Sequence, residues 1–334
     1  MISKSVNQTK APRDGSRRRF RDLFLGADGG GTKTHVVLLD EANNLVGEGF
    51  AGASNPLRVG VETAVSNVVK ATDAACDAGG RTRGDIVSAA LGLAGVRRED
   101  LRRTVRESFL KRVRTKHVEV TTDAEVALYG VTFGESAGLV VIAGTGSICM
   151  GRNARGETET AGGWGPIAGD EGGGAGIARR ALQAIAKASD GRGRLTDLSD
   201  AAIEYFRAGR LEDLAVAIYA PTVDNAKIAG FARFVIETAE NGDQTALEIL
   251  REAGGELGLA ARAVIEKLKL KSRKFPVGCV GGIFNAGELI TDSLMKSISQ
   301  IAPRAYLSAP QLIPAQAAAR IALENFTNGE NKSV

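Results

Sequence analysis

The sequence predicts an α/β protein of two lobes around a cleft. Two segments, one in each half of the chain, share a pattern: an apolar strand, a glycine turn with hydroxyl side chains, and a second strand. Strands and amphipathic helices alternate around both segments, which is typical of α/β folds. The chain of 334 residues has room for two lobes of about 150 residues each.

The first glycine turn lies in residues 28–34 (DGGGTKT), between the apolar runs 23–25 and 36–39. Glycines let a backbone approach a ligand closely and present bare N–H groups, as a phosphate chain requires. The predicted nucleotide contacts here are Gly30, Gly31, Thr32 and Lys33. Lys33 is equally compatible with a solvated turn lysine. A glycine hairpin without a ligand is the alternative for the segment taken alone.

This turn is neither a Walker loop nor a Rossmann turn. A Walker loop has Gly-Lys-Ser/Thr leading into a helix, and a Rossmann turn also opens a helix. Here Thr32 separates Gly31 from Lys33, and a strand follows. Asp28 ends the first strand and is the candidate carboxylate for organising Mg²⁺, because magnesium prefers hard oxygen ligands. An Asx-type turn contact is the alternative for Asp28.

Further strands and helices follow in the first lobe, which is predicted to span residues 22–130. A third strand is expected at 44–49, and apolar spacing predicts an amphipathic helix over 59–78. The remaining predicted elements are a strand at 86–93, a charged helix at 98–112, a strand at 117–121 and a helix from 124. This order is that of a ribonuclease-H-like lobe.

The second lobe is predicted to span residues 131–311. It opens with an apolar run at 139–143, as expected of a buried strand, and the run leads into a second glycine turn with a strand-like pattern after it. The nucleotide contacts predicted in this turn are Gly144, Thr145 and Gly146. A helical region over 177–270 is expected to break near 190, 220 and 241. A strand at 277, a helix through 294, a strand at 305–308 and an alanine-rich helix at 314–323 complete the chain.

A third glycine segment follows the strand around 277. Gly281 and Gly282 turn into a helix, and a glycine pair there would let an adenine ring lie flat against the backbone. A tryptophan and two carboxylates lie in two more glycine-rich segments, 162–165 (GGWG) and 169–172 (GDEG).

With these segments the chain resembles the BadF/BadG/BcrA/BcrD-type ATPase family, most closely its N-acetylglucosamine kinase branch. The resemblance covers residues 23–325. It rests on residues 28–34 (DGGGTKT), 52–56 (GASNP), 121–124 (TTDA), 143–147 (AGTGS), 162–165 (GGWG), 169–172 (GDEG) and 281–284 (GGIF). It implies two ribonuclease-H-like lobes around an ATP cleft, the actin-like ATPase fold, with the final helix 312–326 packed back on the first lobe. It also implies ATP and Mg²⁺ as cofactors, an amino-sugar acceptor and a possible homodimer.

Asp123 is the predicted catalytic residue. It follows a strand directly before a helix, where ligand sites of α/β proteins form. By resemblance, the matching family aspartate accepts the proton of the sugar's 6-hydroxyl. The alternative is an aspartate that caps the helix N-terminus.

The predicted acceptor residues are Asn55, Trp164, Asp170 and Cys149. Sugars present apolar C–H faces that pack on aromatic rings, and their hydroxyls bond to carboxylates and amides. By resemblance, family kinases use residues matching Asn55 and Asp170 for such bonds. Asp170 is also compatible with a helix cap, and Asn55 with a turn residue before Pro56.

Composition and charge limit the kinds of partner that the protein is expected to have. The hydrophobic and charged fractions, 43% and 25%, are those of a soluble globular protein. No apolar run is long enough to span a bilayer. Three scattered cysteines lack metal or redox spacing, which fits the cytoplasm. Residues 1–21 are predicted to form a disordered basic tail. The whole chain has a net charge of +4 and its first 22 residues have +5, so the remaining body has −1. This charge gives the body no overall tendency to bind nucleic acid.

The predicted function is an ATP-dependent amino-sugar kinase that phosphorylates the 6-hydroxyl of N-acetylglucosamine or a relative. One alternative is an activator ATPase of the 2-hydroxyacyl-CoA dehydratase type, whose family members hold an iron–sulfur cluster between two subunits. That cluster needs cysteine ligands, and the three cysteines here do not form the expected pair. The other alternative is a non-catalytic nucleotide or sugar sensor.

Overall fold

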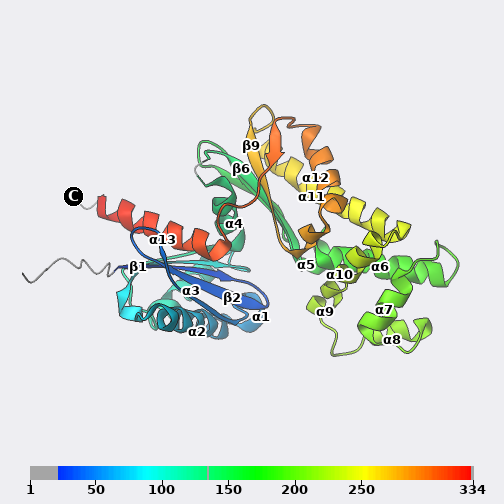
Figure 1. Cartoon of the computed structure of the whole chain (residues 1–334), viewed down its shortest axis with the longest axis horizontal. Helices are drawn as coiled ribbons and strands as arrows, with labels where there is room; N and C mark the ends of the chain where they lie inside the picture. The colour runs from blue at the N-terminus through cyan, green and yellow to red at the C-terminus, as the bar shows by residue number, and fades with distance from the viewer. Residues whose placement is uncertain (1–21, 134, 332–334) are drawn as a thin grey trace, which may run out of the picture.

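The computed structural model of the chain describes residues 22–133 and 135–331, and the predicted basic tail lies outside them. Two five-stranded sheets organise the molecule, in the orders β3-β2-β1-β4-β5 and β10-β9-β6-β7-β8 (Figure 1). The strands are β1 (Leu23–Gly29), β2 (Lys33–Leu39), β3 (Leu45–Gly52), β4 (Ile86–Leu93), β5 (His117–Thr122), β6 (Gly138–Ala143), β7 (Ser147–Arg152), β8 (Thr158–Gly162), β9 (Phe275–Val280) and β10 (Ala305–Leu307). The predicted two-lobe α/β fold is confirmed.

Helices surround the sheets and form most of the second lobe. They are α1 (Pro56–Val59), α2 (Val61–Gly79), α3 (Glu99–Leu110), α4 (Asp123–Thr132), α5 (Gly165–Ala168), α6 (Gly174–Ser189), α7 (Leu198–Phe206), α8 (Leu214–Ile218), α9 (Asn225–Gly230), α10 (Ala232–Glu240), α11 (Gln244–Lys267), α12 (Glu288–Ser299) and α13 (Pro314–Asn331). Three short 3₁₀ turns are η1 (Arg83–Asp85), η2 (Leu211–Asp213) and η3 (Gly282–Ala286).

The two sheets repeat one topology. In the first, β1 pairs antiparallel with β2 and parallel with β4, and β5 continues the parallel side. In the second, β6 has the position of β1, with β7 antiparallel and β9 parallel to it. The glycine turns therefore join equivalent strands, β1 to β2 and β6 to β7, at equivalent places in the two lobes.

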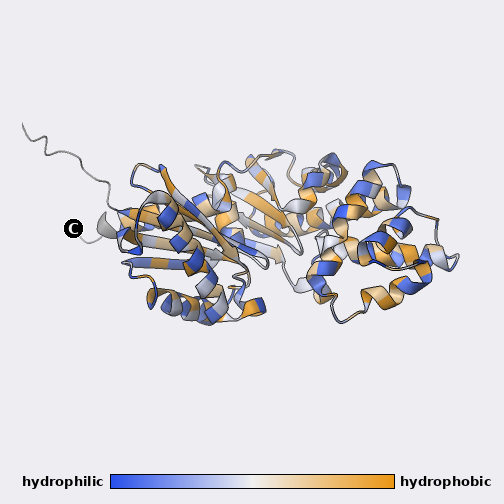
Figure 2. Cartoon of the chain, turned by 60° about the horizontal axis from the view of Figure 1, so that its bottom comes forward, coloured by the Kyte–Doolittle hydropathy of each residue, from blue (hydrophilic) through white to orange (hydrophobic). Residues whose placement is uncertain are grey.

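Helices cover both faces of the first sheet. Helices α2 and α3 pack on one face through apolar side chains that include Val65, Val68 and Phe109. Helix α13 lies along the opposite face (Figure 1), where Phe326 and its alanines contact the strands. The central strands β1 and β4 are buried and mainly apolar, whereas the outer helices carry both apolar and polar residues (Figure 2). This alternation is what burial of one helix face produces.

The second sheet is covered by a helical layer on one face and by α4 on the other. Side chains of β6 such as Leu139 and Val141 pack with α6, α10, α11 and α12 in the largest apolar cluster. The opposite face, with Val140 and Met150, packs against Leu128 and Val131 of α4. Helix α4 thus lies between the two sheets, since Val126 on its other side packs with the first.

The elements differ from the sequence predictions in three places. The helix predicted over 59–78 is α2, which begins at Val61, and the short helix α1 before it was not predicted; Gly60, with a φ of 77°, separates the two. The predicted helical region has an additional break at Arg207, whose φ of 57° ends α7. Strand β8 was not predicted, because it is an incompletely buried edge strand without apolar alternation. Within residues 22–133 and 135–331, no helix combines the length and apolar character that crossing a membrane requires.

We expect Gly26→Ala to destabilise the first lobe. A Cβ at Gly26 would lie 2.1 Å from the carbonyl oxygen of Ala315 and 2.1 Å from the amide nitrogen of Ala319, both backbone atoms of α13. Overpacking of this kind costs about 1–3 kcal/mol of unfolding free energy, measurable by denaturant titration. The control is Gly255→Ala in α11, where nothing lies within 4 Å and alanine should stabilise the helix slightly. Equal stability of Gly26→Ala and the unmodified protein would contradict this account of α13 packing.

Candidate active site

The first glycine turn is fastened to the two segments beside it. The N–H of Gly30 donates to the carbonyl of Lys33 at 3.0 Å and closes the turn. The carbonyl of Gly30 accepts from the N–H groups of Ser54 and Asn55, at 3.0 and 3.1 Å. Thr32 and Lys33 have exposed side chains at the tip, and Gly31 lies between them and Gly30. Hydrogen bonds to Ser54 and Asn55 therefore hold the base of the turn, while its tip is exposed and accessible to a ligand.

The second glycine turn is braced by the N-terminus of α6. The N–H of Gly174 donates to the carbonyl of Gly144 at 2.8 Å, and that of Ala175 to the carbonyl of Thr145 at 2.9 Å. These bonds satisfy helix N–H groups that have no partner within the helix. The Thr145 side chain is exposed, and the Gly144 N–H closes the turn on the carbonyl of Gly146 at 2.9 Å.

Asp28 and Asp123 come to the same edge of the first sheet. Asp28 on β1 is in register with Gly92 on β4, and Gly92 with Thr121 on β5, so Asp123 lies just beyond that row. Burial, and then the nearby charge of Asp123, raise the pKa of Asp28 to about 6, whereas Lys33 acts in the opposite direction. Burial also raises the pKa of Asp123 above its usual value. Two carboxylates in one half-buried place favour a site that receives a cation or a proton.

Asp123 does not cap α4. The N-cap is Thr122, whose side chain accepts from the N–H of Glu125 at 3.1 Å, while the Glu125 carboxylate accepts from the N–H of Thr122 at 2.7 Å. Glu125 also pairs with Arg102 at 3.0 Å. The alternative of a capping aspartate is wrong, because a complete capping box holds the helix end. Asp123 is the first helical residue, and its carboxylate accepts a hydrogen bond from the N–H of Ala124 at 3.0 Å.

Asp170 is tied to the second glycine turn. Its carboxylate oxygen Oδ1 accepts from the N–H of Ser147 at 3.1 Å, and the Ser147 hydroxyl donates to the carbonyl of Glu171 at 2.6 Å. Burial raises the pKa of Asp170. Asp170 has a φ of 61° and lies three residues before Gly173, which is the N-cap of α6. The alternative that Asp170 caps this helix is therefore wrong.

Trp164 is exposed on the segment 162–172, which joins the two glycine-rich segments GGWG and GDEG and is called the acceptor loop below. It is the N-cap residue of α5 and its side chain is 76% exposed. An indole this exposed has a free face for a ligand, because few protein groups pack on it.

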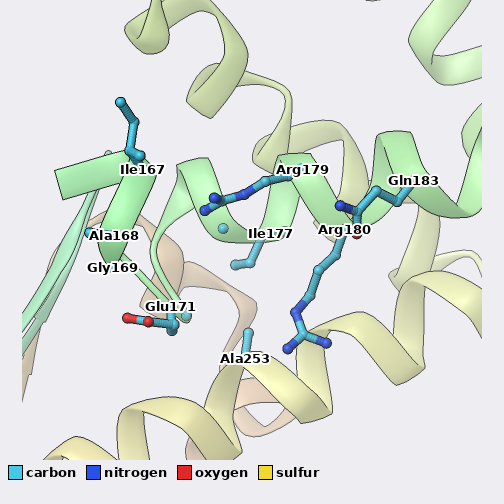
Figure 3. A pocket seen from close by; sticks show the side chains of 11 residues that line it. Ile167, Ala168, Gly169, Glu171, Ile177, Arg179, Arg180, Gln183 and Ala253 are labelled. Atoms are coloured by element: carbon cyan, nitrogen blue, oxygen red, sulfur yellow. The ribbon is translucent and has the colours of Figure 1, made fainter. Parts of the chain in front are cut away.

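A pocket of about 570 Å³ adjoins the acceptor loop, between α5, the start of α6 and α11 (Figure 3). Arg179 and Arg180 extend into it from α6. Both arginines have partners within the protein. Arg179 donates to the carbonyl of Pro166 at 2.8 Å, and Arg180 forms ion pairs with Glu252 and Glu256 of α11. The pocket is therefore a polar recess beside the loop, and its cations support the α5 and α11 walls.

Asn55 caps the short helix α1. Its side-chain oxygen accepts from the N–H of Leu57 at 3.0 Å, and Pro56 occupies the first helical position. The same side chain lies against Gly95, where a Cβ would be 2.4 Å from the amide oxygen. The alternative that Asn55 is a structural turn residue before Pro56 is therefore supported in part, because Asn55 caps α1. Asn55 is half-buried beside the first glycine turn, and its amide NH₂ is left for a ligand by this capping bond.

The third glycine segment lies directly beside the second turn. Gly281 has a φ of 115°, and a Cβ there would lie 2.3 Å from the carbonyl oxygen of Ala143 and 3.1 Å from the amide nitrogen of Gly144. Gly282 is exposed, with nothing within 4 Å of a Cβ. The structure therefore brings Gly281 and the second turn together at one end of β6 and β9.

Cys149 is not part of this surface. Its side chain is 0% exposed and belongs to the apolar cluster beneath α6 and α11. Alternation along β7 points it away from α4, because Ile148 and Met150 take the α4 side. The prediction of Cys149 as an acceptor residue is therefore wrong, because side-chain alternation along β7 buries it.

Two features of the site were missed from the sequence. Ser147 ties the second turn to the acceptor loop, and its place in a Gly-Thr-Gly-Ser run was the available signal. Arg58 of α1 lies against Gly31 of the first turn. Its signal was weaker, because the expected helix began only at residue 59 and left Arg58 in a loop.

The residues present fit a magnesium ion that is held mainly by phosphate and water. Within residues 22–133 and 135–331, no three or more His, Cys, Asp or Glu side chains are grouped to hold a metal ion. Magnesium in phosphoryl-transfer sites uses one or two carboxylates together with substrate phosphates. Asp28, whose pKa is raised by burial and by the neighbouring charge of Asp123, supplies such a carboxylate.

Comparison with known proteins identifies the family. The model of the BadF/BadG/BcrA/BcrD ATPase family matches residues 25–322. An N-acetylmuramic acid/N-acetylglucosamine kinase from Clostridium acetobutylicum is 32% identical over 84% of this chain and 91% of its own length. An N-acetyl-D-glucosamine kinase from Dictyostelium discoideum is 31% identical over 91% of this chain and 99% of its own.

Solved structures agree on the fold. A candidate N-acetylglucosamine kinase from Chromobacterium violaceum superposes with a TM-score of 0.74 at 28% identity, over 90% of this chain and 98% of that one. A ROK family glucokinase from Streptomyces griseus, solved with glucose and AMPPNP, has a TM-score of 0.54 at 20% identity, over 90% of this chain and 98% of that one. The latter supports the fold alone. The chain belongs to the BadF/BadG/BcrA/BcrD ATPase family.

Proposed function

We propose that the protein is an ATP-dependent amino-sugar kinase, which transfers the γ-phosphoryl group of Mg·ATP to the 6-hydroxyl of N-acetylglucosamine or a related amino sugar. The observation that carries this proposal is the pair Asp28 and Asp123 at one sheet edge, next to a fastened glycine turn. The two most similar relatives named above are kinases of N-acetylglucosamine, one of them also of N-acetylmuramic acid.

Asp123 orients the acceptor hydroxyl and takes its proton. The sugar oxygen then forms a bond to the γ-phosphorus while the bond from phosphorus to the leaving ADP oxygen breaks. Burial raises the pKa of Asp123, and a carboxylate with a higher pKa is a stronger base at neutral pH. Its backbone is fixed by the Thr122–Glu125 capping box, so its position does not depend on the ligand.

The glycine turns bind the phosphate chain in this proposal. Backbone N–H groups and hydroxyls of the two turns, together with Lys33, contact the phosphates, and Gly281 and Gly282 face the adenine. Asp28 would hold Mg²⁺, directly or through water, and the ion would neutralise charge on the phosphates. Because both turns are fastened to their own lobes, they act as fixed binding surfaces that cost little reorganisation.

The acceptor occupies the space among Trp164, Asp170 and Asn55. Trp164 packs on an apolar sugar face, and the free oxygen of Asp170 and the Asn55 amide bond to hydroxyls. Cys149 takes no part, because it is buried in the core. A cytoplasmic location, a homodimer and the lobe boundaries 22–130 and 131–311 remain predictions.

The activator alternative is disfavoured by the placement of the cysteines. Cys76 and Cys149 are buried and Cys279 is partly buried. Cys149 and Cys279 lie on strands of the second sheet and Cys76 on α2 of the first lobe, so they do not form a surface cluster for a shared iron–sulfur centre. The sensor alternative predicts ligand binding without turnover. A coupled assay of ADP release with and without amino sugars tests the proposal, and release that requires the sugar supports it.

The first functional prediction concerns Asp123→Asn. Loss of the base should lower kcat by about 10²–10⁴-fold while ATP binding survives. Steady-state kinetics with N-acetylglucosamine, and calorimetric titration with Mg·ATP, measure the two effects. A variant with near-normal kcat would remove Asp123 from this role.

The second functional prediction concerns Trp164→Ala. Because the indole is exposed, its loss should weaken acceptor binding, by about tenfold or more if the ring stacks on the sugar, with little change in ATP affinity or stability. The measurement is KM for the sugar and for ATP, with a thermal melt as the control for folding. An equal loss of both affinities would show that the ring supports the lobe instead.

The third functional prediction concerns the pH dependence of the affinity for Mg²⁺. Since the pKa of Asp28 is raised to about 6, a proton competes with Mg²⁺ there below pH 6, whereas an ordinary aspartate would compete only near its usual value of 3.8. The apparent affinity for Mg²⁺ should therefore be constant above pH 7 and fall by up to about tenfold per pH unit below 6. Titration between pH 5 and 8 measures this, with circular dichroism to verify folding. A flat profile would contradict the assignment of Asp28.

A further inference from the structure

Arg58 joins the two lobes across the cleft. It lies in the last turn of α1 in the first lobe, and its Nη2 is 3.7 Å from Oδ2 of Asp224, which belongs to the second lobe. The side chains are 40% and 66% exposed. At this distance the two groups form a loose ion pair without hydrogen-bond geometry, so little holds Arg58 in its present orientation.

The guanidinium of Arg58 lies over the first glycine turn. A Cβ on Gly31 would be 2.6 Å from Nη1 and 3.4 Å from Cδ of Arg58. The side chain therefore runs directly across the turn, in space that a side chain at position 31 would take. Its charge is at the tip of the turn, beside Thr32 and Lys33, where the first turn is open to a ligand.

Asp224 is connected to the second glycine turn through α9 and α6. It caps α9, since its Oδ1 accepts from the N–H of Lys227 at 2.8 Å. Helix α9 lies against the start of α6, where a Cβ on Gly174 would be 2.9 Å from the carbonyl oxygen of Ala229. The same Gly174 donates to the carbonyl of Gly144 in the second turn. The Arg58–Asp224 pair thus links the elements that carry the two turns.

We propose that Arg58 is a phosphate-binding residue, and that the Asp224 carboxylate is the partner it holds until the phosphate chain of the nucleotide displaces it. This inference rests on the proposed function, because it requires ATP to bind between the two turns. An exposed ion pair is weak, whereas a guanidinium binds phosphate through two charge-assisted hydrogen bonds. The exchange of one anion for the other is therefore favourable, and it needs a rotation of a side chain and no change in the backbone.

The exchange also gives the free protein a contact that keeps the lobes near one another. Asp224 partly neutralises the guanidinium that lies over the first turn. When a nucleotide binds, Arg58 turns its charge to the phosphates and Asp224 is released. Asp224 therefore competes with ATP for the same cation, and its removal should improve nucleotide binding.

The test is calorimetric titration of the full chain with Mg·ATP and with adenosine, which lacks phosphates. Arg58→Met should bind Mg·ATP about 10- to 100-fold more weakly and adenosine within about twofold of the unmodified protein. Arg58→Lys keeps the charge but lacks the planar fork of the guanidinium, so its affinity for Mg·ATP should lie between those of Arg58→Met and the unmodified protein. Asp224→Asn should bind Mg·ATP about two- to fivefold more tightly, because asparagine keeps the cap on α9 and removes the competing charge. Arg103→Met, a change of an exposed arginine on α3, is the matched control and should bind both ligands normally.

Each contrary result has its own meaning. If the unmodified protein binds Mg·ATP and Arg58→Met binds it equally well, Arg58 is not a phosphate-binding residue. If Arg58→Met loses adenosine and Mg·ATP to the same extent, Arg58 supports the lobe, and the inference is again overturned. If Asp224→Asn does not tighten Mg·ATP binding, Asp224 is not the displaced partner. Failure of the unmodified protein to bind Mg·ATP would instead overturn the proposed function on which the inference rests.

Discussion

The position of α4 between the two sheets is the constraint on which the rest of the structure depends. One side of the helix packs on the first sheet through Val126, and the other on the second sheet through Leu128 and Val131. Glycines make this double packing possible: a Cβ at Gly92 would lie 2.5 Å from Val126 Cγ2, and one at Gly278 would lie 2.1 Å from Val131 Cγ2. Because interiors are close-packed, α4 cannot shift without moving a sheet. The carboxylate at its first residue is therefore fixed relative to both lobes.

The two glycine turns are fixed in a different way, each by its own lobe. The first turn is held through the Gly30 carbonyl by the segment that enters α1, and the second by the first N–H groups of α6. Neither arrangement joins the two turns to one another. Their separation is set by α4 and by exposed contacts across the cleft, such as Arg58 with Asp224 at 3.7 Å and Arg97 with Thr160 at 3.4 Å. Packing of α4 thus sets the geometry of the lobes, and weak polar contacts leave the cleft able to adjust to a ligand.

The sequence was a good guide to the fold and to the parts of the site that are backbone. Apolar runs and glycine turns predicted β1, β2, β6, β7 and β9 because burial and turn chemistry are local properties. Contacts between distant segments were not predictable in this way. The tie of Asp170 to Ser147 and the contact of Arg58 with Gly31 depend on how loops fold over one another. Cys149 failed as an acceptor residue because nearness in sequence did not decide which face of β7 it occupies. The family, predicted from the glycine segments, is confirmed by a match over residues 25–322.

The burial of two neighbouring carboxylates, Asp28 and Asp123, costs solvation free energy. Burial raises the pKa of both Asp28 and Asp123, and the charge of Asp123 adds to the shift at Asp28. The exposed Lys33 opposes the pKa shift at Asp28, and the hydrogen bond from the N–H of Ala124 opposes the shift at Asp123, but neither cancels the effect of burial. In the proposed function, a cation brought with the nucleotide would restore that solvation at Asp28, and an acceptor hydroxyl would donate a hydrogen bond to Asp123. The proposed substrates would thus offset the cost of burying both carboxylates, which is how an enzyme uses binding energy to assemble a reactive arrangement.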